Sequence, residues 1–337
     1  MVIFLKHAAR ENGLRLKGGA LVIAGACLWG VSGNVAQYLF QFQHVAPGWM
    51  TALRMIVAGA LLLVAARISG HSIVKIWCDR SARLTLLIFG LIGMIGAQLF
   101  YFESVAAGNA ATATLLQSLS PVLILLYSTL RTHRCPQMRD ILVILLAMTG
   151  VFLIVTHGNP SHLTIAPSAL IWGLLSAVGC AAYAVLPVPL LGKWGAALVI
   201  GWGMVIGGVI LCFVFPLWKY KGAWTPQAMS AIIFVVLFGT LAAFYLYLAS
   251  LKYLRPIETS LLGCAEPLSA AIVSVLWLHV AFTAIDWIGS ACIIGTVVVL
   301  AGIHRPIRSD HRLADLILPD LKRDNRQFVD SHSFPGK

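Results

Sequence analysis

Charged residues are scarce in this sequence, and acidic residues are the scarcest. Asp, Glu, Lys and Arg make up 11% of the 337 residues, hydrophobic residues make up 59%, and the mean hydropathy is +0.89. A soluble globular domain carries about 25% charged residues. The shortage of charge excludes such a domain and predicts that most of the chain lies in a lipid bilayer.

Sequence motifs for nucleotide hydrolysis and for common catalytic centres are also absent. There is no GxxxxGK(S/T) phosphate loop, no GxSxG or HExxH motif, and no cluster of histidine and cysteine. The seven cysteines include no CxxC pair, so neither a zinc site nor a disulfide framework is indicated. We therefore predict no cofactor, no metal site and no enzymatic activity.

Long apolar segments separate the charged ones. A hydrocarbon core about 30 Å thick needs about 20 apolar residues in each helix that crosses it. Ten segments meet this requirement, which predicts an all-α integral membrane protein with ten transmembrane helices. The expected spans are Gly18 to Phe40, Pro47 to Ile68, Leu84 to Val105, Gly108 to Leu130, Asp140 to Thr156, Ile165 to Leu186, Gly195 to Trp218, Ala228 to Leu251, Pro256 to Leu278 and Thr283 to Ile303.

The basic residues lie in the short connections between these spans. The formal net charge of +12 would suit a nucleic-acid-binding protein, but no single face gathers this charge, so no nucleic-acid partner is predicted. In the ten-span topology, every Lys and Arg except Arg54, Lys219 and Lys221 falls on one side of the membrane. Because cytoplasmic loops are rich in Lys and Arg, the N-terminus (residues 1–17) and the tail (residues 304–337) are both predicted to be cytoplasmic.

One stretch of the sequence recurs. Gln98 to Pro121 returns without gaps 146 positions later as Phe244 to Pro267, with five identical positions. We interpret the chain as two repeats, residues 18–156 and 165–303, joined by an external linker of residues 157–164. Each repeat holds five spans, an odd number, so the second repeat is expected to be inverted. Many secondary transporters have inverted repeats, with the substrate site near the membrane midplane between them.

Two charged residues lie well inside expected spans and away from their ends, and a charge at a helix centre costs about 2.5 to 3.5 kcal/mol. Glu266, near the middle of span nine, is either a proton carrier or counter-charge for a cationic substrate, or a protonated residue bonded to a neighbouring helix. Arg54, in span two, binds a substrate carboxylate, pairs with a carboxylate of the protein or extends towards the outer headgroups. Pro121 and Pro267, which lack a backbone N–H, are expected to break spans four and nine.

Polar and aromatic residues of other spans are candidates for the wall of a central cavity. Thr114, Gln117 and Pro121 share one face of span four, and Gln117 needs a hydrogen-bond partner near the midplane. For any single aromatic residue, packing within the helical core is the alternative. The further candidates are Trp29, Asn34, Gln37, Gln98, Tyr101, Tyr183, Tyr245 and Tyr247.

The remaining acidic residues of the apolar region lie near expected span ends. Glu103 and Asp286 are close to outer ends and are interpreted as interfacial. Asp140 and Glu258 begin helices on the cytoplasmic side, where the helix dipole favours a carboxylate. His157 lies outside the membrane, and the sequence shows no catalytic neighbours for it.

These features resemble a known family. Trp29-Gly30 in span one, Arg54 in span two and the two matched segments that end in Pro121 and Pro267 resemble the EamA family of the drug/metabolite transporter superfamily. The strings NAATATLLQSLSP, VTHGNP and CAEPLS resemble its YicL-type bacterial branch. The resemblance implies a ten-helix carrier in the bacterial inner (plasma) membrane, within a family whose members export amino acids or other metabolites.

The sequence is therefore interpreted as that of a secondary transporter. It is expected to export a small metabolite, such as an amino acid or a related solute, by alternating access to a central cavity. The expected partners are a small-molecule substrate, the lipid bilayer and a coupling proton. An importer of a small solute is the first alternative, and a non-transporting membrane scaffold or sensor that docks through its tail is the second.

Overall fold

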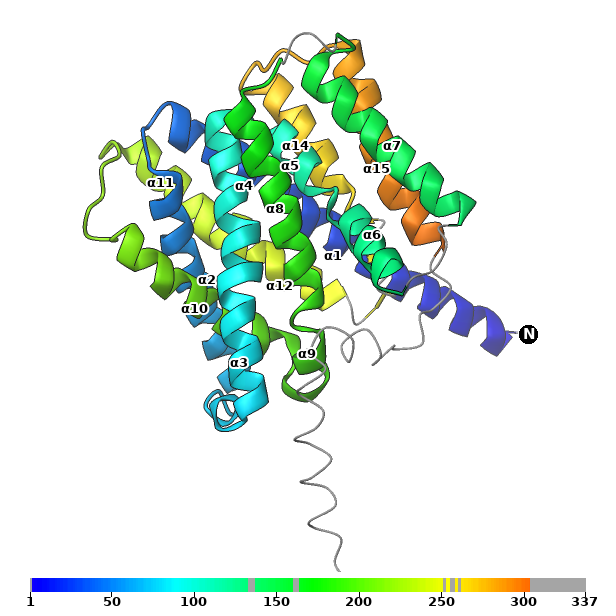
Figure 1. The fold of residues 1–337 in the computed structure, drawn as a ribbon. Coiled ribbons are helices and arrows are strands. Elements are labelled where there is room, and N and C mark those ends of the chain that lie inside the picture. The colour runs from blue at the N-terminus through cyan, green and yellow to red at the C-terminus, as the bar shows by residue number, and fades with distance from the viewer. Residues whose placement is uncertain are drawn as a thin grey trace, which may run out of the picture.

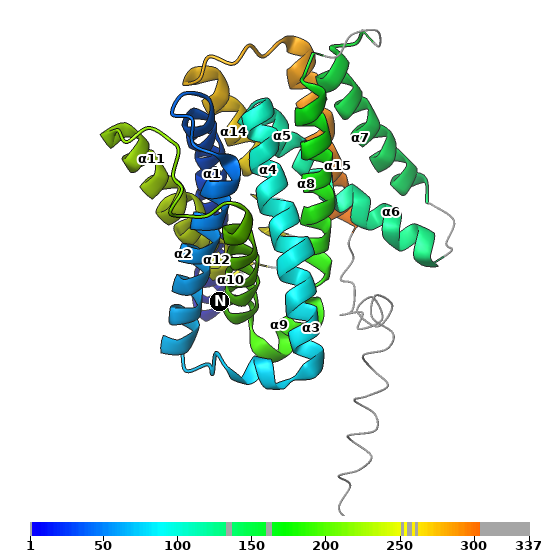
Figure 2. The ribbon, with the colours of Figure 1, turned by 60° about the vertical axis from the view of Figure 1, so that its left-hand side comes forward.

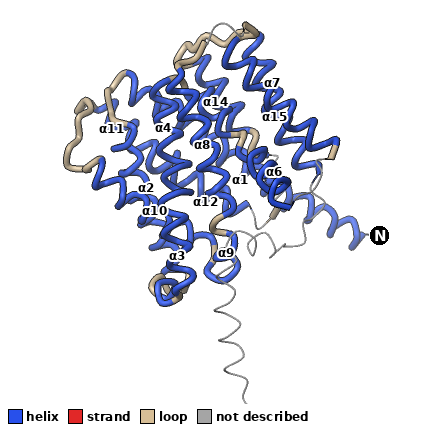
Figure 3. The backbone as a smooth tube through the Cα atoms, in the orientation of Figure 1, coloured by secondary structure: helices blue, strands red, loops and turns tan. Residues whose placement is uncertain are grey.

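The computed structural model describes residues 2–132, 137–159, 164–250, 253–254, 258–259 and 262–303. Within these ranges every regular element is a helix, as Figure 3 shows. The helices lie side by side as a bundle (Figure 1). The expected tail, residues 304–337, and part of the expected external linker lie outside the described residues.

The helices begin at residues that suit a helix start. Pro47, Pro167 and Pro226 stand at first helical positions, where no backbone N–H is needed. The first repeat contains α1 (Val2–Gln41), α2 (Pro47–Ile68), η1 (Lys75–Cys78), α3 (Arg80–Ile88), η2 (Phe89–Met94), α4 (Ile95–Ala107), α5 (Ala110–Gln117), α6 (Ser120–Thr132) and α7 (Met138–Thr156). The second repeat contains α8 (Pro167–Val185), α9 (Val188–Trp194), α10 (Ala196–Val214), α11 (Pro226–Val236), η3 (Leu237–Ala242), α12 (Ala243–Ser250), α14 (Ala265–Leu276) and α15 (Ala284–Ile303).

Apolar helices account for all the expected spans, although some are short. In the described part of the chain, seven helices are long and apolar enough to cross a membrane. Three shorter apolar helices, Asp140–Thr156, Ala265–Leu276 and Ala284–Leu300, correspond to expected spans five, nine and ten. The all-helical, multi-span architecture is thus confirmed, whereas the count of ten spans and the side of the termini stay predictions.

The most extensive helix contacts join the two repeats in a two-fold pattern. α2 packs against α10, and α7 packs against α15, which Figure 2 also shows. α1 contacts α12 and α14 of the second repeat, while α8, the counterpart of α1, contacts α4 and α5 of the first. The core of the bundle therefore lies between the repeats.

Paired glycines bring α4 and α8 into backbone contact. A Cβ atom added at Gly96 would lie 2.9 Å from the Cα atom of Gly179, closer than real Cβ atoms approach. Small residues at a helix crossing allow this approach in membrane proteins. A larger side chain at either position would therefore separate the two repeats along this interface.

Two helices are interrupted at equivalent places. α5 ends at Gln117 and α6 begins at Ser120, immediately before Pro121, which has no N–H to donate to the carbonyl of Gln117. In the second repeat α14 begins at Ala265, and the N–H of Glu266 turns back to Gly263 O at 2.9 Å. Such breaks expose backbone polar groups inside the bundle, which transporters tolerate where the groups line a cavity.

Both repeats also contain a π-helical segment, which the sequence analysis did not predict. η2 interrupts the long helix formed by α3 and α4, and η3 interrupts the helix formed by α11 and α12. Gly93 and Gly239, which have the same separation of 146 positions as the recurring stretch, lie in these two segments. The Thr240 hydroxyl donates to Val235 O at 2.9 Å, which satisfies a carbonyl in the wider turn. Single π turns inside α-helices occur frequently at functional sites.

Candidate ligand-binding cavity

A cavity of about 470 Å³ lies between the two repeats. Small-molecule sites measure about 300 to 1,000 Å³, so the cavity suits a small metabolite. Most residues that the sequence analysis selected as cavity candidates or helix breakers line this cavity. They are Trp29, Arg54, Gln98, Tyr101, Thr114, Gln117, Pro121, Tyr183, Tyr247, Glu266 and Pro267. The structure thus brings these residues together, and their roles in binding or coupling stay predictions.

The cavity extends from the middle of the bundle towards the end where α9 lies. Pro187, Leu191 and Ala196, at the connections of α8, α9 and α10, belong to its wall. At the opposite end, polar contacts join the helices instead: Gln41 Nε2 donates to Gly108 O at 2.7 Å, and Trp49 Nε1 donates to Leu217 O at 3.0 Å. The cavity is therefore asymmetric along the bundle axis.

Arg54 is held on α2 inside the bundle. Its side chain donates through Nη2 to Gln98 Oε1, and its Cζ atom lies 3.8 Å from the centre of the Phe102 ring, a cation–π contact. The residue is only 6% exposed, so it does not extend to the headgroups. No carboxylate of a described residue pairs with it. Extension to the headgroups is thus not observed, no pairing with a described carboxylate is formed, and binding of a substrate carboxylate stays a prediction.

Glu266 lies in the first turn of α14, directly after the helix break. Its side chain lines the cavity, and within the described residues no hydrogen bond or ion pair reaches its carboxylate. Only its backbone carbonyl is engaged, by Ser269 Oγ at 2.9 Å. The bond to a neighbouring helix, which was one interpretation from sequence, is thus not formed among these residues.

Tyr101 and Gln117 bind partners across α4 and α5. The Tyr101 hydroxyl lies 3.0 Å from Thr114 Oγ1, which itself donates to Ala110 O at 2.7 Å. Gln117 Nε2 donates to the backbone carbonyl of Ala97 at 2.9 Å. This carbonyl is the partner that a glutamine near the midplane requires.

Aromatic rings from the two repeats meet at one side of the cavity. The Trp29 ring centre lies 5.1 Å from that of Phe244, in an edge-to-face arrangement, and 5.3 Å from that of Tyr247. Phe244 was not selected from the sequence, although it is the repeat counterpart of Gln98. Its position in the recurring stretch was the signal that would have found it. Leu191 on α9 gave no such signal, because α9 lies in a connection outside the repeat pattern.

Three of the candidates for the cavity wall lie elsewhere. Asn34 is buried between α1 and α14, where it donates to two backbone carbonyls at 3.0 Å and accepts a hydrogen bond from Ser274 Oγ at 2.6 Å. Gln37 accepts from Ala110 N at 2.9 Å and thereby caps the start of α5. Tyr245 is 68% exposed on the outside of the bundle. Residues two positions apart on a helix point to nearly opposite faces, so Tyr245 and the cavity residue Tyr247 diverge.

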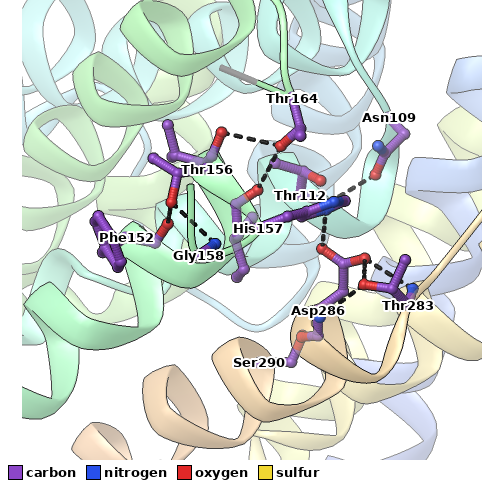
Figure 4. A network of polar contacts seen from close by, with 12 residues as sticks. Asn109, Thr112, Phe152, Thr156, His157, Gly158, Thr164, Thr283, Asp286 and Ser290 are labelled. Carbon is purple, nitrogen blue, oxygen red and sulfur yellow. Dashed lines mark hydrogen bonds and ion pairs between the residues drawn. The ribbon is translucent and has the colours of Figure 1, made fainter. Parts of the chain in front are cut away.

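A second polar cluster, shown in Figure 4, lies away from the cavity. Asp286 at the start of α15 lies with Oδ1 2.8 Å from His157 Nε2 at the end of α7. Its Oδ2 accepts from Thr283 N and Thr283 Oγ1, both at 2.8 Å. The Asp286 side chain is 8% exposed and lies at a helix end, as expected, but it is engaged in hydrogen bonds that the sequence did not indicate. The cluster connects the end of α7 to the start of α15.

A bundle of apolar helices that forms two matched halves around an internal cavity is the architecture of many membrane transporters. The chain belongs to the EamA-like transporter family, whose sequence model matches residues 16–156 and again residues 167–302. The predicted family and the multi-pass inner-membrane location are therefore confirmed. The family name describes a transporter rather than an enzyme.

The chain is similar to several bacterial relatives. It is 36% identical to the uncharacterized inner membrane transporter YicL of Salmonella typhimurium, with 85% of this chain and 95% of the relative covered. It is 23% identical to the uncharacterized transporter YwfM of Bacillus subtilis, over 84% and 93% of the two chains. A solved crystal structure with 18% sequence identity matches at a TM-score of 0.56 over 86% of this chain and 96% of that one. This structural likeness concerns the fold alone.

Proposed function

We propose that this protein is a secondary transporter that exports a small metabolite, such as an amino acid or a related solute. The observation that carries the proposal is the cavity between the repeats, whose wall contains a guanidinium and a carboxylate that form no ion pair with any described residue. Buried polar groups inside a membrane protein are costly, and those that persist mark substrate and ion pathways. The cavity volume of about 470 Å³ limits the cargo to a small molecule.

The proposed topology has ten spans with both termini in the cytoplasm. Under this topology the connections that carry Asp79 and Lys193 face the cytoplasm, and so does the end of the bundle towards which the cavity extends. The conformation described here would then load its substrate from the cytoplasm. Rocking of one repeat against the other would close this end and open the end joined by Gln41 and Trp49, which releases the substrate outside.

Glu266 is the proposed proton carrier. A carboxylate that no described residue of the protein engages can exchange a proton with whichever side of the membrane the cavity faces. A proton that enters from the outside would return the empty carrier and drive export by exchange. The two helix breaks beside Pro121 and Pro267 place backbone groups at the centre of this motion.

Purified protein in liposomes with an imposed pH gradient tests this proposal. Wild-type protein is expected to move labelled amino acids from a panel faster when the compartment that receives the substrate is acidic. Glu266→Gln should lose this dependence on the pH gradient but keep exchange of substrate for substrate. Glu103→Gln is the matched control, because Glu103 on α4 does not line the cavity.

Unchanged pH dependence in Glu266→Gln would contradict the coupling role. The direction of transport is measured in bacterial membrane vesicles of known orientation. Uptake driven into inside-out vesicles supports export. Uptake confined to right-side-out vesicles would instead identify an importer.

A further inference from the structure

Arg54 is a buried cation that no carboxylate of the described residues neutralises. It is 6% exposed, its Nη2 reaches an uncharged amide oxygen of Gln98, and its Nε makes no hydrogen bond. An uncompensated charge inside a protein is strongly unfavourable. A ligand that supplies an anionic group to this guanidinium would therefore gain binding free energy from contacts that the protein leaves open.

Glu266 presents the opposite charge to the same cavity. No described residue donates a hydrogen bond to its carboxylate, and it does not pair with Arg54. The two side chains come from different repeats, α2 in the first and α14 in the second. Two charges of opposite sign thus face one cavity, and neither forms an ion pair with the other or with another described residue.

The side chain of Tyr101 lines the same cavity, and its hydroxyl presents an acceptor. Thr114 Oγ1 uses its only proton on Ala110 O, so Tyr101 must donate in their 3.0 Å hydrogen bond. The lone pairs of the Tyr101 oxygen are therefore free to accept from a ligand N–H.

We infer that the cavity selects zwitterions, with the anionic group of the ligand at Arg54 and its ammonium group at Glu266 and Tyr101. The inference rests on the proposed function, and it narrows the cargo to molecules that carry both charges. Polyamines and uncharged nucleosides are excluded by it.

Charge balance explains why one charge on the ligand is not enough. A simple cation would neutralise Glu266 but leave Arg54 buried without an anion and repel it. A simple carboxylate would neutralise Arg54 and leave Glu266 open. A zwitterion compensates both groups and adds no net charge to a site inside the membrane, where net charge is costly.

Matched ligands test the inference by thermal unfolding of the purified full-length protein in detergent, since a ligand that binds the folded state raises its apparent stability. The panel contains α-amino acids of increasing side-chain size, each beside its amide, which lacks the carboxylate, and its deaminated acid, which lacks the ammonium. At least one amino acid is expected to stabilise the protein. Its amide and its acid should bind about tenfold to a hundredfold more weakly, the effect of one hydrogen-bonded charge.

Two variants assign each charge to its residue. Arg54→Gln should lose the discrimination between an amino acid and its amide, while Glu266→Gln should lose the discrimination between the amino acid and its deaminated acid. A residue with only a structural role would change neither ratio. Arg67→Gln, at the exposed end of the same helix as Arg54, and Glu103→Gln are the controls and should keep both ratios.

Several outcomes would overturn the inference: no stabilisation by any zwitterion, equal stabilisation by an amide or an acid, or unchanged ratios in both cavity variants. These outcomes are separable from a failure of the proposed function. A zwitterion that binds by these rules but crosses liposome membranes under no gradient would contradict transport and leave the inference standing. Transport of a polyamine without zwitterion binding would support transport and contradict the inference that the cavity selects zwitterions.

Discussion

Glu266 and Asp286 both lie in the first turn of a helix in the second repeat, yet the protein treats them differently. The Asp286 carboxylate accepts hydrogen bonds from His157 and from both donors of Thr283. The Glu266 carboxylate accepts no hydrogen bond from a described residue. The N-terminal helix dipole favours a carboxylate at both positions, so it does not explain the difference. What separates them is hydrogen-bond satisfaction: one carboxylate connects two helices, and the other is left open to the cavity.

The largest effect on stability is expected at Asp286, because its carboxylate has hydrogen-bond partners in the protein. Asp286→Asn should lower the free energy of unfolding by about 2 kcal/mol, because hydrogen bonds to a charged group contribute about 1.5 to 3 kcal/mol and the amide of Asn keeps only one of the two accepting oxygens, so either His157 or Thr283 loses its acceptor. Chemical denaturation of the detergent-solubilised protein measures this loss. Transport per folded molecule should change little, since Asp286 does not line the cavity. A variant as stable as the wild type would show that the cluster does not hold α7 and α15 together.

The same isosteric change at Glu266 should leave stability unchanged or raise it by up to about 1 kcal/mol. Glu266→Gln removes no hydrogen bond made by a described side chain and replaces a buried charge with a neutral amide, which lowers the cost of desolvation. Denaturation of both variants under identical conditions compares the two carboxylates directly. If Glu266→Gln destabilises the protein as much as Asp286→Asn, the carboxylate has a structural partner and the contrast between the two residues fails.

A third carboxylate, Asp79, is expected to show the smallest effect. It caps α3 and accepts from Lys193 Nζ at 2.9 Å. Partial burial raises the pKa of Asp79, but hydrogen bonds from Lys193 and from the N–H groups of Ala82 and Ser81 outweigh it and hold the pKa below its ordinary value of 3.8. The stabilisation from this pair is therefore complete above pH 3.8 and is lost as the pH falls through the lowered pKa.

Lys193→Met tests this third carboxylate. Because Lys193 is 64% exposed, the variant should lose only about 0.2 to 0.5 kcal/mol at pH 7. The difference from the wild type should shrink as the pH is lowered below 3.8, which unfolding curves at several pH values measure. A difference that grows on acidification would mean that Asp79 is not the titrating partner.

Sequence reasoning found the cavity because polar residues are costly in a membrane and therefore carry information. Arg54, Gln117 and Glu266 stood out for this reason, and the recurring stretch added Tyr101 and Tyr247. The same rule misplaced Asn34 and Gln37, because a polar side chain can also satisfy backbone groups between helices, and sequence alone does not show which partner it meets. Tyr245 was misplaced because aromatic residues suit both a cavity and the lipid.

Features that depend on long-range contacts could not be predicted from the sequence. The pairing of His157 with Asp286 joins residues 129 positions apart, and nothing in their local sequences indicates it. The shortness of α14 was partly predictable from Pro267. The contribution of α9 to the cavity wall was not, because a connection of seven helical residues carries no periodic signal.

The π segments η2 and η3 set the direction in which the cavity residues point. An α-helix turns about 100° per residue, so the extra residue in a π turn rotates everything beyond it by about that angle relative to the preceding half. Gln98 and Tyr101 lie beyond η2, and Phe244 and Tyr247 lie beyond η3. Both repeats thus use one additional residue per helix to turn cavity-lining side chains inward.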